Sequence, residues 1–428
     1  MVFLQKLEAH LGFPLNLKNS FISCCVLLFP GLIPVVEHSG GVIFILLTLA
    51  GLIFSLDERK NLEPWEKHIF LGFLIFFLVC LLSLINTQDM DAGMQRVEKL
   101  LHFPFAFFAY LFIRSARIDL TRVFIYGLCL GAVILFVSSA YDVFVLNIGR
   151  ARGAYYSILL GDQAVMVAVL LLATALLFFK KTKQQFISMG FVLLAMLASL
   201  LAAGKGGWLF LPVALFFLVA VIVYLKTYRS LFVLGGGLLA VFSIWMLALL
   251  LNIGVVKNST ELVVNMITNP AAGEARTLTV RQSLWRHAIT IWKVHPIIGT
   301  GLGDFFRDNR ELVSASDGYS KERFGHAHNI YLNALATTGI LGFASLVVGV
   351  FIYPVNAMLR SNSYALKQSL SSFVFCSSVL VIVGFAIFGM TEGWLDRNPF
   401  VRIYLLFLLV LFSIFAVKQT RQATSVKN

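Results

Sequence analysis

Long uninterrupted runs of apolar residues constrain this chain more than any other feature of its sequence. The runs are about 17–25 residues long, the length a helix needs to cross a hydrocarbon core of roughly 30 Å. They make the chain of 428 residues 59% hydrophobic and only 13% charged. A transmembrane β-barrel would instead alternate apolar and polar positions over segments of about ten residues. Because these runs do not alternate, we expect an all-α, polytopic membrane protein.

The apolar runs predict about twelve transmembrane helices, of which the fourth is short. The predicted spans cover residues 19–36, 39–56, 67–86, 100–113, 123–146, 157–179, 185–203, 207–225, 231–254, 329–357, 369–390 and 400–417. We therefore expect three regions. The first nine spans fall in residues 1–254, a large loop with short helices in 255–328, and three spans with a short tail in 329–428.

Basic residues in the short loops predict the orientation of the chain. Lys and Arg accumulate on the cytoplasmic side, except in loops longer than about 60 residues. With cytoplasmic termini, 18 of the 34 Lys and Arg residues lie inside and only seven lie in short outer loops. The net charge of +13 thus has a topological explanation, and we expect no nucleic-acid partner. The five cysteines lie inside apolar runs, which favours free thiols over disulfides or a metal cluster.

Seven basic residues lie in short outer loops against this bias: Arg96, Lys99, Arg150, Arg152, Lys205, Arg397 and Arg402. Lys205, in AAGKGGW, links two spans almost directly, and its neighbouring glycines let another group approach the backbone. We interpret Lys205 as an anion-binding residue. The alternative is that its side chain reaches to the lipid headgroups.

The segment TLTVRQSLWRHAITIWKV in the large loop has the apolar pattern of a helix. Four residues at intervals of four, three and four share one face: Arg281, Trp285, Ala288 and Trp292. A cation on that face needs an anionic partner. Arg281 therefore binds either an anionic ligand or a protein carboxylate such as Glu392.

The stretch from Gly325 to Gly342 gathers polar groups where the large loop meets the tenth span. Its histidines, His326 and His328, precede Asn329. Histidine titrates near neutrality and can take a proton from an attacking hydroxyl. The alternative is that both histidines are ordinary interfacial residues.

The outer face of a bacterial inner membrane has no ATP, so group transfer there needs a donor that is already activated. A polyprenyl diphosphate sugar is such a donor. Its departing diphosphate must be bound by cations. The sequence offers Arg281, Lys205 and Arg150 or Arg152 on the same side as His328. Asp89-Met-Asp91 matches a metal-diphosphate motif, but a solvated loop explains it more simply.

These features resemble the O-antigen ligases within the O-antigen ligase and polymerase superfamily. His328-Asn329, followed after nine residues by Gly339 and Gly342, fits the pattern H-N-x9-G-x-x-G. VRQSLW followed by HPIIGTGLGDF resembles the arginine and the P-x-x-G-x-G stretch of the superfamily's large loop. The resemblance covers roughly residues 200–400.

The resemblance implies a glycosyltransferase with a GT-C-like arrangement of membrane helices. Such an enzyme transfers O-antigen polysaccharide from undecaprenyl diphosphate to a sugar hydroxyl of the lipid A core, at the periplasmic face of the inner membrane. The family is thought to invert the anomeric centre without a metal, nucleotide or other cofactor.

The same resemblance implies roles for individual residues. His328 is the general base and Arg281 binds the diphosphate. Lys205 stands where relatives usually have arginine, so it keeps the charge but lacks the bidentate fork. Glu392 takes a place where relatives tend to have an acid and would orient His328 or Arg281. His326 and Asn329 support substrate binding. We further expect Gly339 and Gly342 to let a neighbouring helix pack closely.

Two alternatives remain. A sister enzyme, an O-antigen polymerase or a protein O-oligosaccharyltransferase, would use the same donor and site. Protein-directed relatives often carry a large soluble C-terminal domain, which the short tail here disfavours. A transporter of lipid-linked sugars would place ionisable groups near the bilayer midplane, where only Asp162 is clearly found.

Overall fold

The computed structural model describes residues 17–250, 257, 264, 275–314, 317, 320–321, 324–361 and 369–427. Within these residues every regular element is helical and there is no strand, which confirms the all-α prediction. The first part of the predicted large loop lies mostly outside the described residues. Among those described, seven helices are long and apolar enough to cross a membrane, and three shorter apolar helices accompany them. The count of about twelve spans remains a prediction.

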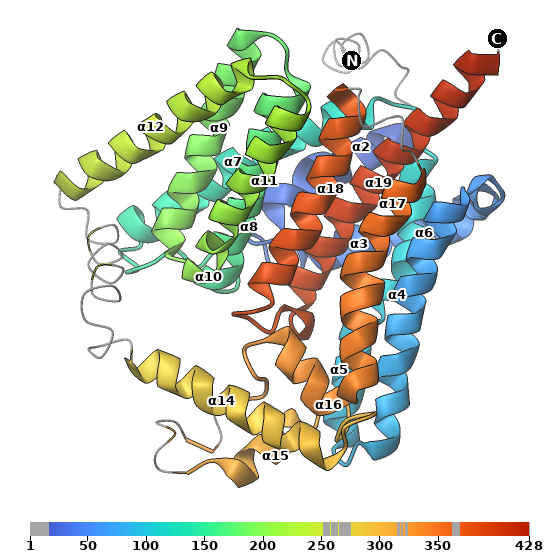
Figure 1. Cartoon of the computed structure of the whole chain (residues 1–428), viewed down its shortest axis with the longest axis vertical. Coiled ribbons are helices and arrows are strands. Elements are labelled where there is room, and N and C mark those ends of the chain that lie inside the picture. The colour runs from blue at the N-terminus through green and yellow to red at the C-terminus, as the bar shows by residue number, and fades with distance from the viewer. Residues whose placement is uncertain are drawn as a thin grey trace.

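The helices follow the predicted apolar runs (Figure 1). The N-terminal part contains α2 (Leu17–Leu32), α3 (Ser39–Phe54), α4 (Pro64–Leu82), α5 (Met90–Leu100), α6 (His102–Arg114), α7 (Leu120–Ala140), α8 (Ser157–Ala173) and α9 (Thr182–Ala202). The C-terminal part contains α10 (Lys205–Trp208), α11 (Phe210–Tyr224), α12 (Arg229–Leu250), α14 (Ala275–Val294), α15 (Phe305–Leu312), α16 (Ile330–Ser345), α17 (Tyr353–Ser361), α18 (Ser369–Phe388) and α19 (Asn398–Lys427). Each predicted span overlaps one of these helices.

Two helices form the centre of the bundle. The apolar stretch of α8 is 94% buried and that of α19 is 89% buried, whereas that of α11 is only 28% buried. α19 packs against α18, α6 and α3, and α8 packs against α9, α7 and α18. A helix that is apolar all round suits such a central position, whereas outer helices leave apolar side chains for lipid to cover.

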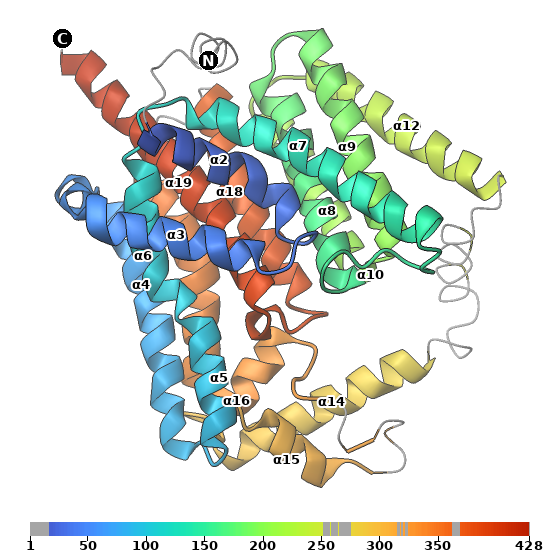
Figure 2. The same ribbon diagram turned by 180° about the vertical axis from the view of Figure 1, so that it is seen from behind.

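An external layer covers one end of the bundle and consists of α14, α15, α5 and the start of α16 with the segment before it. α14 and α15 lie across this end beside α5 and α16, opposite the end at which α19 finishes (Figures 1 and 2). The buried stripe of α14 is Leu284, Ala288 and Ile291, so the predicted stripe was rotated. Arg281, Trp285 and Trp292 flank it and are partly exposed.

The helix that begins beside the histidines is broken at Gly339. This residue has φ 64° and ψ −166° inside α16, a left-handed conformation that favours glycine. The break frees backbone groups on both of its sides. A turn of the large loop, residues 296–301, fills it through four hydrogen bonds: Thr300 N to Ala336 O, Gly301 N to Thr337 O, Ile340 N to Pro296 O and Leu341 N to Ile297 O, at 3.1, 3.1, 2.9 and 3.2 Å.

The expected role of Gly339 was therefore wrong, and that of Gly342 stays a prediction. A Cβ at Gly339 would lie 2.3 Å from Ile297 O, and a Cβ at Gly342 would meet Thr338 of the same helix at 1.8 Å. The missing side chain of Gly339 leaves room for the backbone of a loop, and not for a neighbouring helix. Non-helical backbone within an apolar helix is tolerated where other parts of the protein satisfy it, as this turn does.

Candidate active site

The segment that carries the histidines is fixed at the start of α16. Asn329 is the N-cap: its Oδ1 accepts hydrogen bonds from the backbone N–H groups of Tyr331 and Leu332, both at 3.0 Å. Its Nδ2 donates to Met390 O at 3.3 Å, in the loop that follows α18. Asn329 thus positions His328, and its contribution to substrate binding stays a prediction.

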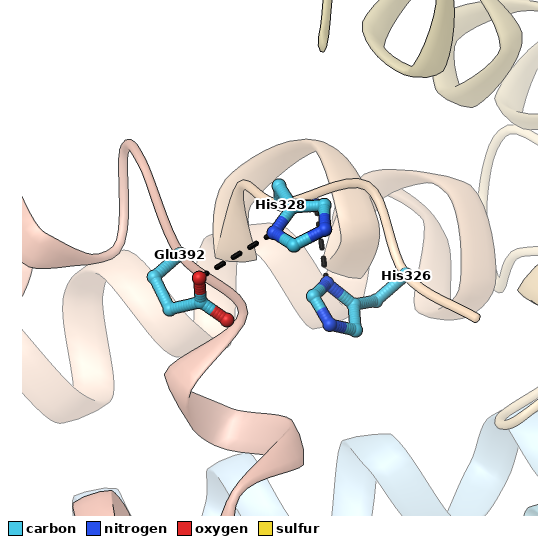
Figure 3. Close-up of side chains that lie close together, drawn as sticks. All are labelled: His326, His328 and Glu392. Atoms are coloured by element: carbon cyan, nitrogen blue, oxygen red, sulfur yellow. Dashed lines mark hydrogen bonds and ion pairs between the residues drawn. The ribbon is translucent and has the colours of Figure 1, made fainter. Parts of the chain in front are cut away.

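His326, His328 and Glu392 come together beside this cap (Figure 3). One nitrogen or carboxylate oxygen from each lies within 4.8 Å of the others. His328 Nδ1 is 3.4 Å from Glu392 Oε2, and the backbone N–H of His328 donates to His326 Nδ1 at 3.2 Å. Gly393 allows this approach, since a Cβ there would lie 2.6 Å from His326 Nδ1.

His328 itself has an unusual backbone conformation. Its φ is 48°, in the left-handed region that residues other than glycine adopt uncommonly. Such strain persists only when neighbouring contacts hold it, and it is often found at functional sites. Here the contacts are the bond from the His328 N–H to His326 and the cap at Asn329.

Burial and charge set the ionisation of this cluster. Burial raises the pKa of the Glu392 carboxyl, but His328, His326 and Arg397 outweigh burial and hold the pKa below its usual value. Burial lowers the pKa of His326 to about 3, and the neighbouring His328 acts in the same direction. At neutral pH Glu392 is therefore a carboxylate. His326 is a neutral ring whose Nδ1 accepts the His328 N–H.

The same three side chains offer donor types that Zn²⁺ takes in proteins, two imidazoles and a carboxylate. The 3.4 Å between His328 Nδ1 and Glu392 Oε2 is close to the roughly 3.3 Å edge of a tetrahedral site with bonds of about 2.0–2.1 Å. His326 Nδ1 already accepts a backbone hydrogen bond, which metal binding at that atom would break. Metal-independent transfer remains a prediction that chelation tests.

Lys205 begins α10, a short turn that lies next to this cluster. A Cβ at Gly206 would lie 2.5 Å from Thr391 Oγ1, beside Glu392. A Cβ at Gly207 would lie 2.7 Å from Asp162 Oδ1 on α8. The glycines around Lys205 thus allow close approach of other groups, as the sequence predicted.

Arg150 and Arg152 lie on the connection between α7 and α8, beside the end of α9. Arg150 donates from Nε and Nη2 to Ala202 O and Ala203 O, both at 3.3 Å, at the carbonyl end of α9. Arg152 is exposed, and its backbone N–H donates to Asp142 Oδ2 at 2.8 Å. Both arginines are near the turn that carries Lys205, and neither bonds to the histidine cluster among the described residues.

Arg281 is carried by a helix that packs directly on the histidine segment. Leu284 and Ala288 of α14 belong to one buried apolar cluster with Ala327 and Ala336. Among the described residues Arg281 has no hydrogen-bond or ion-pair partner, and it does not pair with Glu392, which contacts His328. The structure therefore brings the helix of Arg281 to the site, while its guanidinium is held by no described carboxylate.

Two residues near the cluster were absent from the predicted site. Arg397 lies 5.1 Å above the ring of Tyr156 and contributes positive charge near Glu392. Asp162 is fully buried against α10. The sequence could have indicated both residues as site candidates. Arg397 is a basic residue in a predicted short outer loop, and Asp162 is a carboxylate inside a predicted span.

Residues 190–347 match a protein-family model described as O-Antigen ligase. The chain carries an O-antigen ligase domain. This confirms the resemblance seen in the sequence. The O-antigen ligase domain includes Lys205, Arg281, His326, His328 and Asn329. Glu392, Arg150 and Arg152 lie outside the matched residues.

A relative of the chain is an uncharacterized protein of Haemophilus influenzae (strain ATCC 51907 / DSM 11121 / KW20 / Rd). The two are 24% identical over 402 residues, which is 91% of this chain and 96% of the relative. The similarity therefore extends well beyond the O-antigen ligase domain on both of its sides.

Proposed function

We propose that this chain is an O-antigen ligase. It transfers O-antigen polysaccharide from undecaprenyl diphosphate to a sugar hydroxyl of the lipid A core at the periplasmic face of the bacterial inner membrane. The observation that carries the proposal is the contact between His328 and Glu392 in a chain with an O-antigen ligase domain. A histidine oriented by a carboxylate is an arrangement that general-base catalysis uses. The apolar helices are suited to a membrane, where both lipid-borne substrates are located.

In the proposed reaction, His328 Nε2 accepts the proton of the acceptor hydroxyl as its oxygen attacks the anomeric carbon of the donor sugar. The glycosidic C–O bond forms while the bond from that carbon to the diphosphate oxygen breaks. Undecaprenyl diphosphate leaves with the electron pair, and attack from the opposite face inverts the anomeric centre. Glu392 stabilises the imidazolium that forms on His328.

The departing diphosphate needs positive charge close to the membrane surface. Arg281 is suited to bind it because its planar fork can donate two parallel hydrogen bonds. Lys205 adds charge from α10, next to the loop of Glu392. Arg150 and Arg152 add further charge beside the end of α9.

The deciding experiment compares acceptors. The purified, reconstituted protein receives a lipid-linked polysaccharide with lipid A core, with further lipid-linked repeat units, or with a pilin-like protein. We expect only the lipid A core to be extended. Extension of repeat units would identify a polymerase, and extension of the protein a protein O-oligosaccharyltransferase. Transbilayer movement of lipid-linked sugar without transfer would identify a transporter.

Three further measurements test the assigned roles. His328→Ala should lower the transfer rate by about 10²–10⁴-fold. The control is His68→Ala, which replaces an exposed histidine of α4 and should leave the rate unchanged.

Arg281→Lys should weaken transfer because lysine lacks the planar fork of arginine, and wild-type behaviour would contradict bidentate binding. EDTA should leave transfer intact, and loss of activity that Mg²⁺ or Zn²⁺ restores would contradict the metal-independent mechanism.

A further inference from the structure

Arg96 joins the two segments that carry His328 and Glu392. Its Nη1 forms an ion pair with Asp396, four residues after Glu392. Its Nη2 donates to Gly325 O at 3.1 Å, three residues before His328. The side chains of Arg96 and Asp396 are only 18% and 10% exposed. Since the guanidinium is planar and donates in fixed directions, the position of one segment constrains the other.

The helix that carries Arg96 is anchored independently of the two segments. Asp304, in the large loop, accepts the backbone N–H groups of Gln88 and Asp89 at 2.8 and 3.0 Å. Asp89 in turn caps α5 by accepting the N–H of Ala92 at 3.0 Å. The Asp89-Met-Asp91 motif thus begins with a helix cap. α5 presents Arg96 from a fixed base.

Two hydrogen bonds and the close approach of Gly393 to His326 also join the two segments. Asn329 Nδ2 donates to Met390 O, and Ile330 N donates to Gly389 O at 2.8 Å. The direct contact between His328 Nδ1 and Glu392 Oε2, at 3.4 Å, is long for a hydrogen bond. Arg96 supplies a second point of attachment.

A small cavity lies beside this attachment. Arg96 and Asp396 line a cavity together with Phe76, Leu100, Leu302 and Asn333. The cavity has a volume of about 40 Å³, so side chains do not completely fill the space beside the pair. Loss of the guanidinium would remove the ion pair and the hydrogen bond that join the two segments beside this cavity.

We propose that Arg96 is a positioning residue that holds the His328 ring against the Glu392 carboxylate. This inference rests on the proposed roles of His328 and Glu392 in transfer. Arg96 acts through these two residues by fixing the segments on which they lie.

A double-mutant cycle tests the proposal through activity. Arg96→Ala should lower kcat by about 10²-fold, the effect of a misplacement of about 1 Å, with little change in KM for the donor. Arg96→Lys, which keeps the charge without the fork, should recover only part of this loss. Gln95→Ala, on the exposed face of the same helix, should match wild type.

The cycle is completed in the Glu392→Gln background, where Arg96→Ala should have little further effect because the contact it protects is already lost. Additive losses, accompanied by a lower melting temperature for Arg96→Ala, would show a merely structural role and overturn the proposal.

A second readout does not depend on transfer. Diethyl pyrocarbonate modifies exposed histidine nitrogens, and peptide mapping follows His328 relative to His38, whose side chain is 84% exposed. Arg96→Ala and Glu392→Gln should each raise the relative rate at His328, and the double variant should match the single ones. An unchanged rate in Arg96→Ala would overturn the positioning role. If His328→Ala retained transfer while Arg96→Ala still raised the His328 rate, the proposed function would fail and the inference about Arg96 would stand.

Discussion

The membrane bundle and the external layer are held together by different interactions. At the centre of the bundle, α8 and α19 bury apolar side chains along nearly their whole apolar stretch. The fully buried apolar cluster of the layer is small, comprising Leu284, Ala288, Ile291, Phe305, Ala327 and Ala336. Much of the layer depends instead on single hydrogen bonds, such as those of Asp304 and Arg96. Many weak contacts tolerate one change, whereas single polar contacts do not, so substitutions in the layer should affect the site most.

Glu392→Gln should give the largest effect because it removes the charge beside His328 while keeping the shape of the side chain. We expect transfer to fall by about 10²–10⁴-fold. The pKa of Glu392 is below its usual value of 4.5, so the carboxylate stabilises the fold above that pH. This contribution is lost as the pH falls through the lowered value.

Melting temperatures measured across the acidic range check the stability part, since the Gln variant should lack this dependence. Glu98→Gln, on the exposed face of α5, serves as the control for both rate and stability. Wild-type transfer by Glu392→Gln would show that the contact with His328 does not matter.

Gly339→Ala should give the next largest effect. The added Cβ would lie 2.3 Å from Ile297 O, and alanine at φ 64° and ψ −166° costs a further ~1–3 kcal/mol of backbone strain. The inserted turn must then move, and we expect transfer to fall by about 10²-fold while the bundle remains folded. Transfer assays with circular dichroism test this. Gly235→Ala on α12, where a Cβ would meet no atom within 4 Å, should behave as wild type; equal losses would remove the contrast between the two regions.

His326→Gln should change how stability depends on pH. The pKa of His326 is about 3 when folded, and the value of an unperturbed histidine is 6.5. Between these values only the unfolded chain binds the proton, so wild-type stability falls as the pH falls from about 6.5 towards 3. The Gln variant should lose less of its melting temperature over this range. An identical pH profile in wild type and variant would contradict a buried, neutral His326.

Leu408→Met in α19 should give the smallest effect. Leu408 is fully buried, but methionine has a similar volume and can adapt to the site. We expect less than about 1.5 kcal/mol of destabilisation and unchanged transfer. A large loss of transfer would mean that the bundle controls the site as tightly as the external layer does.

The positions of the membrane helices could be predicted because each apolar run is a local signal. The family could also be predicted, since the His328-Asn329 pattern and the glycine-rich loop are continuous motifs. The contact between His328 and Glu392 was only one of two options, because nothing local distinguishes it from a pair between Arg281 and Glu392. Distances between segments about 60 residues apart in the chain are not encoded in spacing.

Other parts of the site were mispredicted for related reasons. Gly339 and Gly342 match a pattern typical of helix packing, but the partner of Gly339 is a turn some 40 residues earlier. The stripe of α14 was assigned by tryptophans, which are large enough to flank a buried face without being buried. Arg96 could be noticed as an unexpected outer cation, but its partners, Asp396 and Gly325, lie 300 and 229 residues away.

The break in α16 also bears on biogenesis. A helix leaving the translocation channel normally satisfies its own backbone, and each bare amide or carbonyl in lipid costs several kcal/mol. Around Gly339, the backbone of α16 instead makes four hydrogen bonds with the turn at residues 296–301. The ribosome makes that turn first, because residues 296–301 precede α16 in the chain. Because the turn precedes α16 in the chain, the turn is already available to bind the free backbone groups of α16 when this helix is inserted.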